Sequence, residues 1–80
     1  MKTIQLQYFA ILREQAGTSY AEHCTGAATL GDLYAELRSQ HGFTLESSQI
    51  KVACNEEFAA LDTPLADGDT VVFIPPVAGG

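Results

Sequence analysis

The first segment of the chain alternates between apolar and polar side chains with a period of two. The apolar set consists of Ile4, Leu6 and Tyr8. This period predicts a half-buried strand over residues 3–9. Phe9 falls on the opposite face, which is otherwise occupied by glutamines, so its ring is either covered by the following segment or left as an exposed apolar contact.

The next two segments show a weaker pattern. Residues 10–16 carry Arg13 and Glu14 and stop before Gly17, and we interpret them as a loop or short turn. Residues 19–24 read as a second strand. A connection of about nine residues allows the two strands to pair antiparallel as a loose hairpin.

A helical period follows the second strand. Thr29 is a suitable N-cap with Asp32 three positions later, and Gly42 stands where a left-handed residue would end a helix. Between them, four apolar residues recur at i, i+3, i+4 and i+7, and these are Leu30, Leu33, Tyr34 and Leu37. The pattern predicts one main helix.

The second half of the chain reads as three strands separated by turns. Residues 50–54 alternate, Asn55 tolerates the positive φ of a tight turn, and residues 57–60 return as a short strand with Phe58 near the tip. Two turn signals precede the last strand, residues 70–74. Its almost continuous apolar character suggests burial on both faces and a central position in the sheet.

This order of elements predicts an α+β domain. If the first and last strands are central neighbours and the helix crosses one face, the fold is a β-grasp (ubiquitin-like) mixed sheet of four to five strands with one main helix. A chain of 80 residues makes one domain. We place the β-grasp domain at residues 1–75 and an extended C-terminal tail at residues 76–80.

The last six residues, which comprise Pro75 and the tail, are Pro75-Pro76-Val77-Ala78-Gly79-Gly80. The last two residues of the tail carry no side chain, so the reactive group it presents is the terminal carboxylate. A terminal Gly-Gly arises by chance in about one chain in 200, and chain ends are often frayed. Frayed ends are usually polar, whereas these residues follow the apolar strand 70–74 with no polar spacer between. We therefore interpret the tail as a functional arm.

The charge balance restricts the class of partner. Ten acidic residues against four basic residues give a formal net charge of −6. Binding to a phosphate backbone draws on clustered Lys and Arg, so we expect no nucleic acid and favour a protein partner with a basic surface. No run approaches the roughly 18 apolar residues of a membrane span, and no signal-peptide core is present. We therefore expect no membrane association and a cytoplasmic location.

Few side chains suggest chemistry of their own. Cys24 and Cys54 lack a C-x-x-C spacing, so we expect no metal site and interpret both as small buried apolar residues; whether they form a disulfide stays open. His23 and His41 are isolated, which favours surface or capping roles. Residues 67–69, Asp-Gly-Asp, are interpreted as a turn because a calcium loop needs more oxygen ligands.

Several motifs resemble a known family, the small subunit of molybdopterin synthase (MoaD type). They are Tyr8-Phe9-Ala10-Ile11-Leu12-Arg13-Glu14, Val52-Ala53-Cys54-Asn55, Pro64-Leu65-Ala66-Asp67-Gly68-Asp69 and the run from Val71 to Gly80. The resemblance spans nearly the whole chain, and the combination of D-G-D with P-P-V-A-G-G is its most specific part. Cys54 departs from the family, which more often has a β-branched aliphatic residue there.

The resemblance implies a sulfur carrier that is not catalytic alone but is the sulfur-donating subunit of a sulfurtransferase complex. In that family, a partner related to ubiquitin-activating enzymes (MoeB type) adenylates the C-terminal carboxylate with ATP. The resulting thiocarboxylate donates sulfur to a cyclic pterin precursor in molybdenum cofactor biosynthesis. Carried over to this chain, Gly80 bears the sulfur and Gly79 is its slim neighbour. The resemblance implies no bound cofactor or metal, since the activating partner consumes the ATP.

The family also implies a complex with the large synthase subunit (MoaE type), with two copies of each chain. We expect an apolar patch at the root of the tail, formed by Phe9, Phe58 and Ile74. The tail residues expected to contact the partner are Pro75, Pro76, Val77 and Ala78. Two alternatives stay open. One is a thiamine-pathway sulfur carrier or ubiquitin-like protein modifier, against which the P-P-V-A run argues, and the other is a non-reactive β-grasp binding module.

Overall fold

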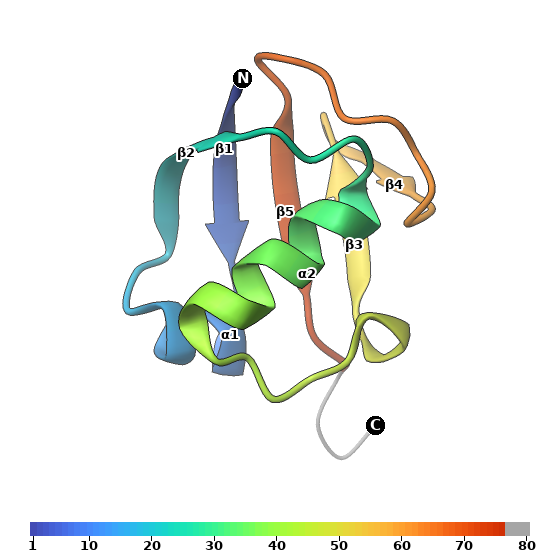
Figure 1. Ribbon diagram of the computed structural model, residues 1–80. Helices are drawn as coiled ribbons and strands as arrows, with labels where there is room; N and C mark the ends of the chain where they lie inside the picture. The colour runs from blue at the N-terminus through green and yellow to red at the C-terminus, as the bar shows by residue number, and fades with distance from the viewer. Residues whose placement is uncertain (77–80) are drawn as a thin grey trace.

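A five-stranded mixed sheet forms the body of the protein in a computed structural model, which describes residues 1–76 (Figure 1). The elements in chain order are β1 (Lys2–Tyr8), α1 (Ala10–Ala16), β2 (Tyr20–Thr25), α2 (Leu30–His41), the 3-10 helix η1 (Ser47–Gln49), β3 (Lys51–Cys54), β4 (Glu57–Ala59) and β5 (Thr70–Ile74). The strand order in the sheet is β2-β1-β5-β3-β4.

The first and last strands are parallel neighbours in the middle of this sheet. Their register sets Gln5 opposite Thr70 and Tyr8 opposite Phe73. The other three strand pairs are antiparallel. Helix α2 crosses one face of the sheet (Figure 1). This arrangement is the β-grasp topology, so the predicted α+β fold is confirmed.

The core lies between α2 and the sheet. On β1, Ile4, Leu6 and Tyr8 are at most 2% exposed, because alternate side chains of a strand point to the same face. The four apolar residues of the predicted helical stripe are also buried. The predicted caps are confirmed, since the Thr29 hydroxyl accepts a hydrogen bond from the Asp32 amide at 3.1 Å and Gly42 adopts a left-handed φ of 72°.

Residues 10–16 form a helix, α1, so the prediction of a loop or short turn is wrong. No side chain caps its N-terminus, and seven residues are too few for an isolated helix to be stable in water. Burial of Leu12, which is fully inaccessible, supplies the missing stability. Residues 1–76 therefore contain two α-helices. Phe9 is the N-cap residue of α1 instead of continuing the face of β1 that carries the glutamines.

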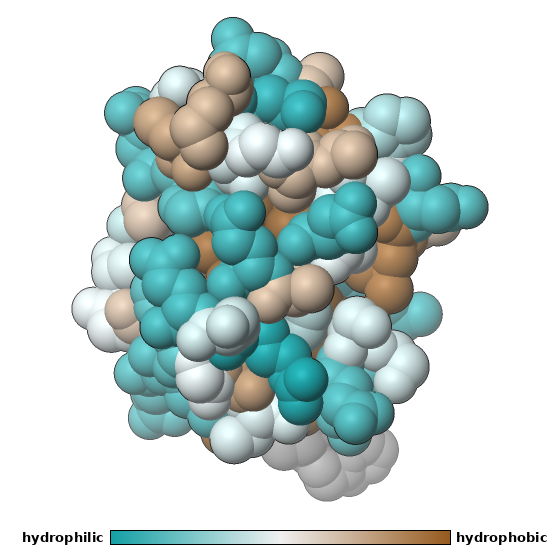
Figure 2. Space-filling view, viewed as in Figure 1, coloured by the Kyte–Doolittle hydropathy of each residue, from teal (hydrophilic) through white to brown (hydrophobic). Residues whose placement is uncertain are grey.

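The last strand is central, as predicted, but it is not buried on both faces. Val71 and Phe73 are fully buried against the side that carries α2, whereas Val72 and Ile74 are half-buried. The reason is that α2 covers one face of the sheet. We call the other side, which carries Val72 and Ile74, the open face. Figure 2 shows the α2 side, where hydrophilic residues dominate the surface.

The two cysteines are free thiols, and Cys24 corrects another expectation. Cys24 is exposed and Cys54 is half-buried, so neither is the fully buried apolar residue predicted. Cys24 lies on an edge strand, β2, at a position that alternates with the half-buried His23 and the buried Thr25. Within residues 1–76, no group of three or more His, Cys, Asp or Glu is placed to bind a metal ion. The described helices are also too short or too polar to cross a bilayer.

Candidate functional site

The root of the tail, residues 74–76, lies where the middle strand of the sheet ends. Strand β5 is bonded to β1 on one side and to β3 on the other, and Lys51 of β3 pairs with Ile74. Pro75 is buried and Pro76 is exposed. Neither proline has a backbone N–H to extend the ladder, so strand pairing stops here. The sheet therefore holds the start of the tail at a fixed point, while Val77, Ala78, Gly79 and Gly80 lie outside the described residues.

Phe9 and Ile74 lie at the same end of the sheet. Tyr8 of β1 and Phe73 of β5 are opposite each other in parallel register, and Phe9 and Ile74 directly follow them in the sequence. Phe9 is 41% exposed and Ile74 is half-buried. The predicted exposure of Phe9 is confirmed, although its cause is the turn from β1 into α1.

Phe58 lies further along the open face, on the edge strand β4. It is 76% exposed, and it pairs with Ala53, which in turn pairs with Val72 of β5. With neighbouring strands about 4.8 Å apart, this row sets Phe58 roughly 10 Å from β5. The structure thus places Phe9 and Ile74 at the same end of the sheet and Phe58 at the edge of the open face.

Sequence reasoning missed Val72 and Ala53 as members of this apolar row. Each is a half-buried residue between larger candidates. Alternation along each strand shows which residues share a face, but membership of a row also requires the strand order and register. These two quantities become known only from the structure.

The Asp-Gly-Asp turn fastens the entry to β5, as the turn interpretation predicted. Asp69 accepts hydrogen bonds from the Ala66 amide at 2.8 Å and from Asn55 Nδ2 at 2.9 Å, and Asp67 accepts one from the Thr3 amide at 2.7 Å. The bond from the Ala66 backbone, followed by that from Asn55, lowers the pKa of the Asp69 carboxyl. The motif thereby ties the loop before β5 to the β3–β4 turn and to β1.

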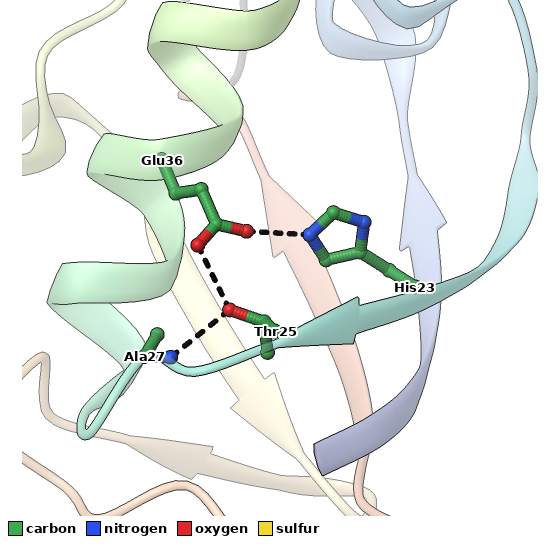
Figure 3. A network of polar contacts seen from close by, with 4 residues as sticks. All are labelled: His23, Thr25, Ala27 and Glu36. Atoms are coloured by element: carbon green, nitrogen blue, oxygen red, sulfur yellow. Dashed lines mark hydrogen bonds and ion pairs between the residues drawn. The ribbon is translucent and has the colours of Figure 1, made fainter. Parts of the chain in front are cut away.

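A second polar network joins β2 to α2 (Figure 3). His23 Nε2 lies 2.6 Å from Glu36 Oε2, while Thr25 Oγ1 donates to Glu36 Oε1 at 2.9 Å and accepts from the Ala27 amide at 3.0 Å. The hydrogen bond with His23 is the main cause that lowers the pKa of Glu36. The role of His23 is therefore to hold the helix on the sheet. His41, in the last turn of α2, packs edge-on against Tyr8 with 6.0 Å between ring centroids.

Comparison with known protein sequences identifies two kinds of relative. The ThiS family matches residues 6–80. The chain is 35% identical to the molybdopterin synthase sulfur carrier subunit of Escherichia coli K12, with 96% of this chain and 99% of that protein covered. It is also 34% identical to small archaeal modifier protein 3 of Haloferax volcanii, with 96% and 98% covered.

Solved structures show the same two groups. The crystal structure of Haloferax volcanii small archaeal modifier protein 1 superimposes with a TM-score of 0.79 at 31% identity, covering 96% of this chain and all of that one. A chain in the complex of subunits 1 and 2 of the molybdopterin-converting factor from Helicobacter pylori 26695 has a TM-score of 0.66 at 26% identity. That match covers 98% of this chain and 99% of the other.

Proposed function

Because the chain belongs to the ThiS family of sulfur carriers, we propose that it is the sulfur carrier subunit of a molybdopterin synthase. The observation that carries this proposal is the path of the chain at its C-terminal end. The middle strand of the sheet leads through Pro75 and Pro76 toward the terminal Gly-Gly, and the family match extends to Gly80. In this proposal the folded domain presents the terminal carboxylate of Gly80 as the reacting group.

The chemistry follows from the properties of a carboxylate. A carboxylate is a poor electrophile, so an activating partner first transfers AMP from ATP to Gly80 and releases pyrophosphate. A sulfur nucleophile then displaces AMP and leaves a thiocarboxylate. The thiocarboxylate reacts as an anion, in the way that a thiolate outperforms a thiol, and it transfers its sulfur to the cyclic pterin precursor.

The composition of the tail suits insertion into a partner. Gly79 and Gly80 let the backbone enter a channel too narrow for a Cβ atom. Pro75 and Pro76 restrict φ and lower the conformational entropy that is lost when the arm becomes ordered. From Pro76 to Gly80 the reach is about 15 Å at roughly 3.3 Å per residue. This length allows the carboxylate to reach a buried site.

We propose that the apolar patch of Phe9, Phe58 and Ile74 binds the large synthase subunit. The exposed rings of Phe9 and Phe58 support this assignment, since burying such a side chain contributes about 1.5–3 kcal/mol. The likeness to a chain in the Helicobacter pylori complex of subunits 1 and 2 supports a partner of this kind. The proposed assembly contains two small and two large subunits.

Mass spectrometry tests the carrier chemistry. The chain is incubated with ATP, a sulfur source and a ubiquitin-activating-like adenylyltransferase whose activity on another carrier has been verified. Replacement of one carboxyl oxygen by sulfur adds about 16 Da in the exchange described above. A variant lacking Gly80 serves as the control and should gain no mass. If the full chain also stays unmodified, the carrier proposal is wrong.

A protein modifier is the second candidate, because the chain is 34% identical to a small archaeal modifier protein. A modifier and a sulfur carrier share the activation of the C-terminus and differ in the reaction that follows it. A modifier forms amide bonds with lysines of other proteins, which survive reducing agents. A synthase subunit returns to its unmodified mass once the large subunit and the pterin precursor are added. Adducts in a cell extract that resist reduction would favour the modifier.

A further inference from the structure

Lys51 has an unusual position among the four basic residues of the chain. Its partner in the β3–β5 ladder is Ile74, at the root of the tail. Lys51 is exposed, and it alternates with the buried Val52, so its side chain leaves the sheet on the open face. Within residues 1–76, Lys51 forms no ion pair with an acidic side chain, and the contact between His23 and Glu36 is an ion pair when His23 is protonated.

The other three basic residues lie elsewhere. The Lys2 ammonium donates to the Ala27 carbonyl at 2.9 Å. Arg13 and Arg38 belong to the two α-helices. Lys51 is therefore the basic residue of the described strands that projects from the open face, on a chain whose net charge is −6.

A hollow of about 590 Å³ adjoins Lys51 at the β3–β4 edge of the sheet. Its lining is apolar apart from Lys51, and it includes Ile50, Leu61 and the exposed Phe58. The volume lies within the range of about 300–1,000 Å³ that is typical of ligand sites. The hollow thus combines an apolar wall, one ammonium group and direct continuity with the proposed patch through Phe58.

We propose that this hollow receives a segment of the large synthase subunit in which an acidic side chain lies beside an apolar one, and that Lys51 pairs with the acidic group. The proposal rests on the proposed function and adds the chemistry that the partner must present. An apolar side chain fills the hollow against Ile50 and Leu61, and the carboxylate meets the Lys51 ammonium at the rim.

The physical role of this pair is orientation. The net charge of −6 attracts a basic partner from a distance but does not specify how the partner is rotated. The positive charge of Lys51, opposite Ile74, has the sign opposite to the net charge of the chain. It disfavours every orientation of the partner that brings a second cation to the root of the tail. Lys51 is therefore a specificity-determining residue that aligns the partner's channel with the tail.

The test measures the dissociation constant for the purified large subunit by calorimetry. Lys51→Met should weaken binding about tenfold, Lys51→Glu about 100-fold, and Lys51→Arg less than about threefold. Arg38→Met is the matched control, because it removes the same charge from an exposed position on α2, away from the open face. It should change the constant less than about twofold. Ala60→Trp adds bulk to the hollow without changing charge and should weaken binding about tenfold.

Three outcomes overturn the proposal. Wild-type affinity for Lys51→Met shows that no acid meets Lys51, and an equal loss for Arg38→Met shows that only net charge matters. Wild-type affinity for Ala60→Trp shows that the hollow stays empty. In each case the wild-type complex still supports the proposed function. If the wild-type chain does not bind the large subunit, the proposed function and this inference fall together.

Discussion

His23 and Glu36 join the edge strand β2 to helix α2 through a contact of 2.6 Å between Nε2 and Oε2. The same carboxylate accepts a hydrogen bond from Thr25, which is fully buried. One acidic side chain therefore ties the helix to two positions of the sheet.

Replacing Glu36 should reduce stability in a pH-dependent way. Because the pKa of Glu36 is lowered from 4.5 in the folded protein, its contribution is present above pH 4.5 and is lost as the pH falls through the folded-state value. Because the Glu36 side chain is 41% exposed and solvent screens the interaction, we expect about 0.5 kcal/mol, so Glu36→Gln should lower Tm by about 2–4 °C at neutral pH. In thermal scans the difference from wild type should disappear on acidification. Glu14→Gln, an exposed carboxylate on α1, is the control and should change Tm little at any pH. A difference that persists in acid would mean that packing, and not charge, is lost.

Two tyrosines offer a matched comparison of buried hydroxyls. The Tyr8 hydroxyl is buried without a hydrogen-bond partner in the described chain, whereas the Tyr34 hydroxyl donates to the Leu45 carbonyl at 2.7 Å. Tyr8→Phe removes the cost of an unsatisfied group and should raise the free energy of unfolding by about 1 kcal/mol. Tyr34→Phe should lower it by about 1 kcal/mol. Urea titrations measure both, and a destabilised Tyr8→Phe would indicate a buried water bound to that hydroxyl.

The burial of Tyr8 should also make the protein less stable at alkaline pH. Burial raises its pKa from 10.0 to about 12. The unfolded chain releases this proton at lower pH than the folded protein does, so ionisation favours the unfolded state above pH 10. The free energy of unfolding is therefore unaffected by this group below pH 10 and falls as the pH rises toward 12. Tyr8→Phe should show a smaller decrease of Tm over this range than wild type. Equal decreases would exclude Tyr8 as the cause.

Gly31 is a position in α2 where a larger residue should not fit. A Cβ atom there would lie 3.1 Å from the Leu61 carbonyl oxygen, which already accepts a hydrogen bond from the Gly31 amide at 2.8 Å. Gly31→Ala should therefore destabilise the fold by about 1 kcal/mol in spite of the better helix propensity of alanine. Gly26→Ala, with open space around the new methyl group, should be neutral or slightly stabilising. Denaturant midpoints of both variants measure the change in stability. A stabilised Gly31→Ala would show that the loop at Leu61 moves to accommodate the methyl group at little energetic cost.

Phe9→Asp should weaken binding to the large subunit by about tenfold or more. Unfolding would not explain such a loss, because Phe9 is the N-cap of α1 with extended backbone and aspartate is favoured at N-caps. Ile11→Asp is the control. Ile11 is also 41% exposed, but it lies within helix α1 and is not one of the residues assigned to the patch. Calorimetry with the purified partner measures both constants. Unchanged affinity for Phe9→Asp would remove Phe9 from the patch.

Deleting Gly80 should abolish sulfur transfer while the domain stays folded and binds the large subunit nearly as tightly as wild type. The reason is that the buried apolar core is formed by residues between Ile4 and Phe73, and the deletion leaves all of these side chains in place. Circular dichroism, binding and product formation are measured on one preparation. A deletion that unfolds the domain would show that the tail is not chemically separate from it.

Most of the fold was predictable where local pattern and tertiary packing agree. The stripe of Leu30, Leu33, Tyr34 and Leu37 and the caps at Thr29 and Gly42 are such a case, since each feature alone favours the same helix. Helix α1 was not predictable, because its stability comes from burying Leu12 and no capping side chain indicates its start.

The candidate site also has a part that the sequence predicts and a part that depends on tertiary structure. The importance of Gly79 and Gly80 rests on a motif at the end of the chain, which stays a prediction because these residues lie outside the described part. The pairing of Lys51 with Ile74 and the row from Phe58 to Val72 depend on strand order and register. Both are set by contacts between distant segments, which the pattern along a single strand does not encode.

The parallel pairing of β1 with β5 has a practical consequence for handling the protein. Both strands run in the same direction, so the start of β1 at Lys2 and the end of β5 at Ile74 lie at opposite ends of the sheet (Figure 1). A strand of this length spans roughly 20 Å. An affinity tag, fluorophore or surface linkage at the amino terminus is thereby kept a full strand length from the root of the tail, and immobilised protein should remain accessible to both of the proposed partners.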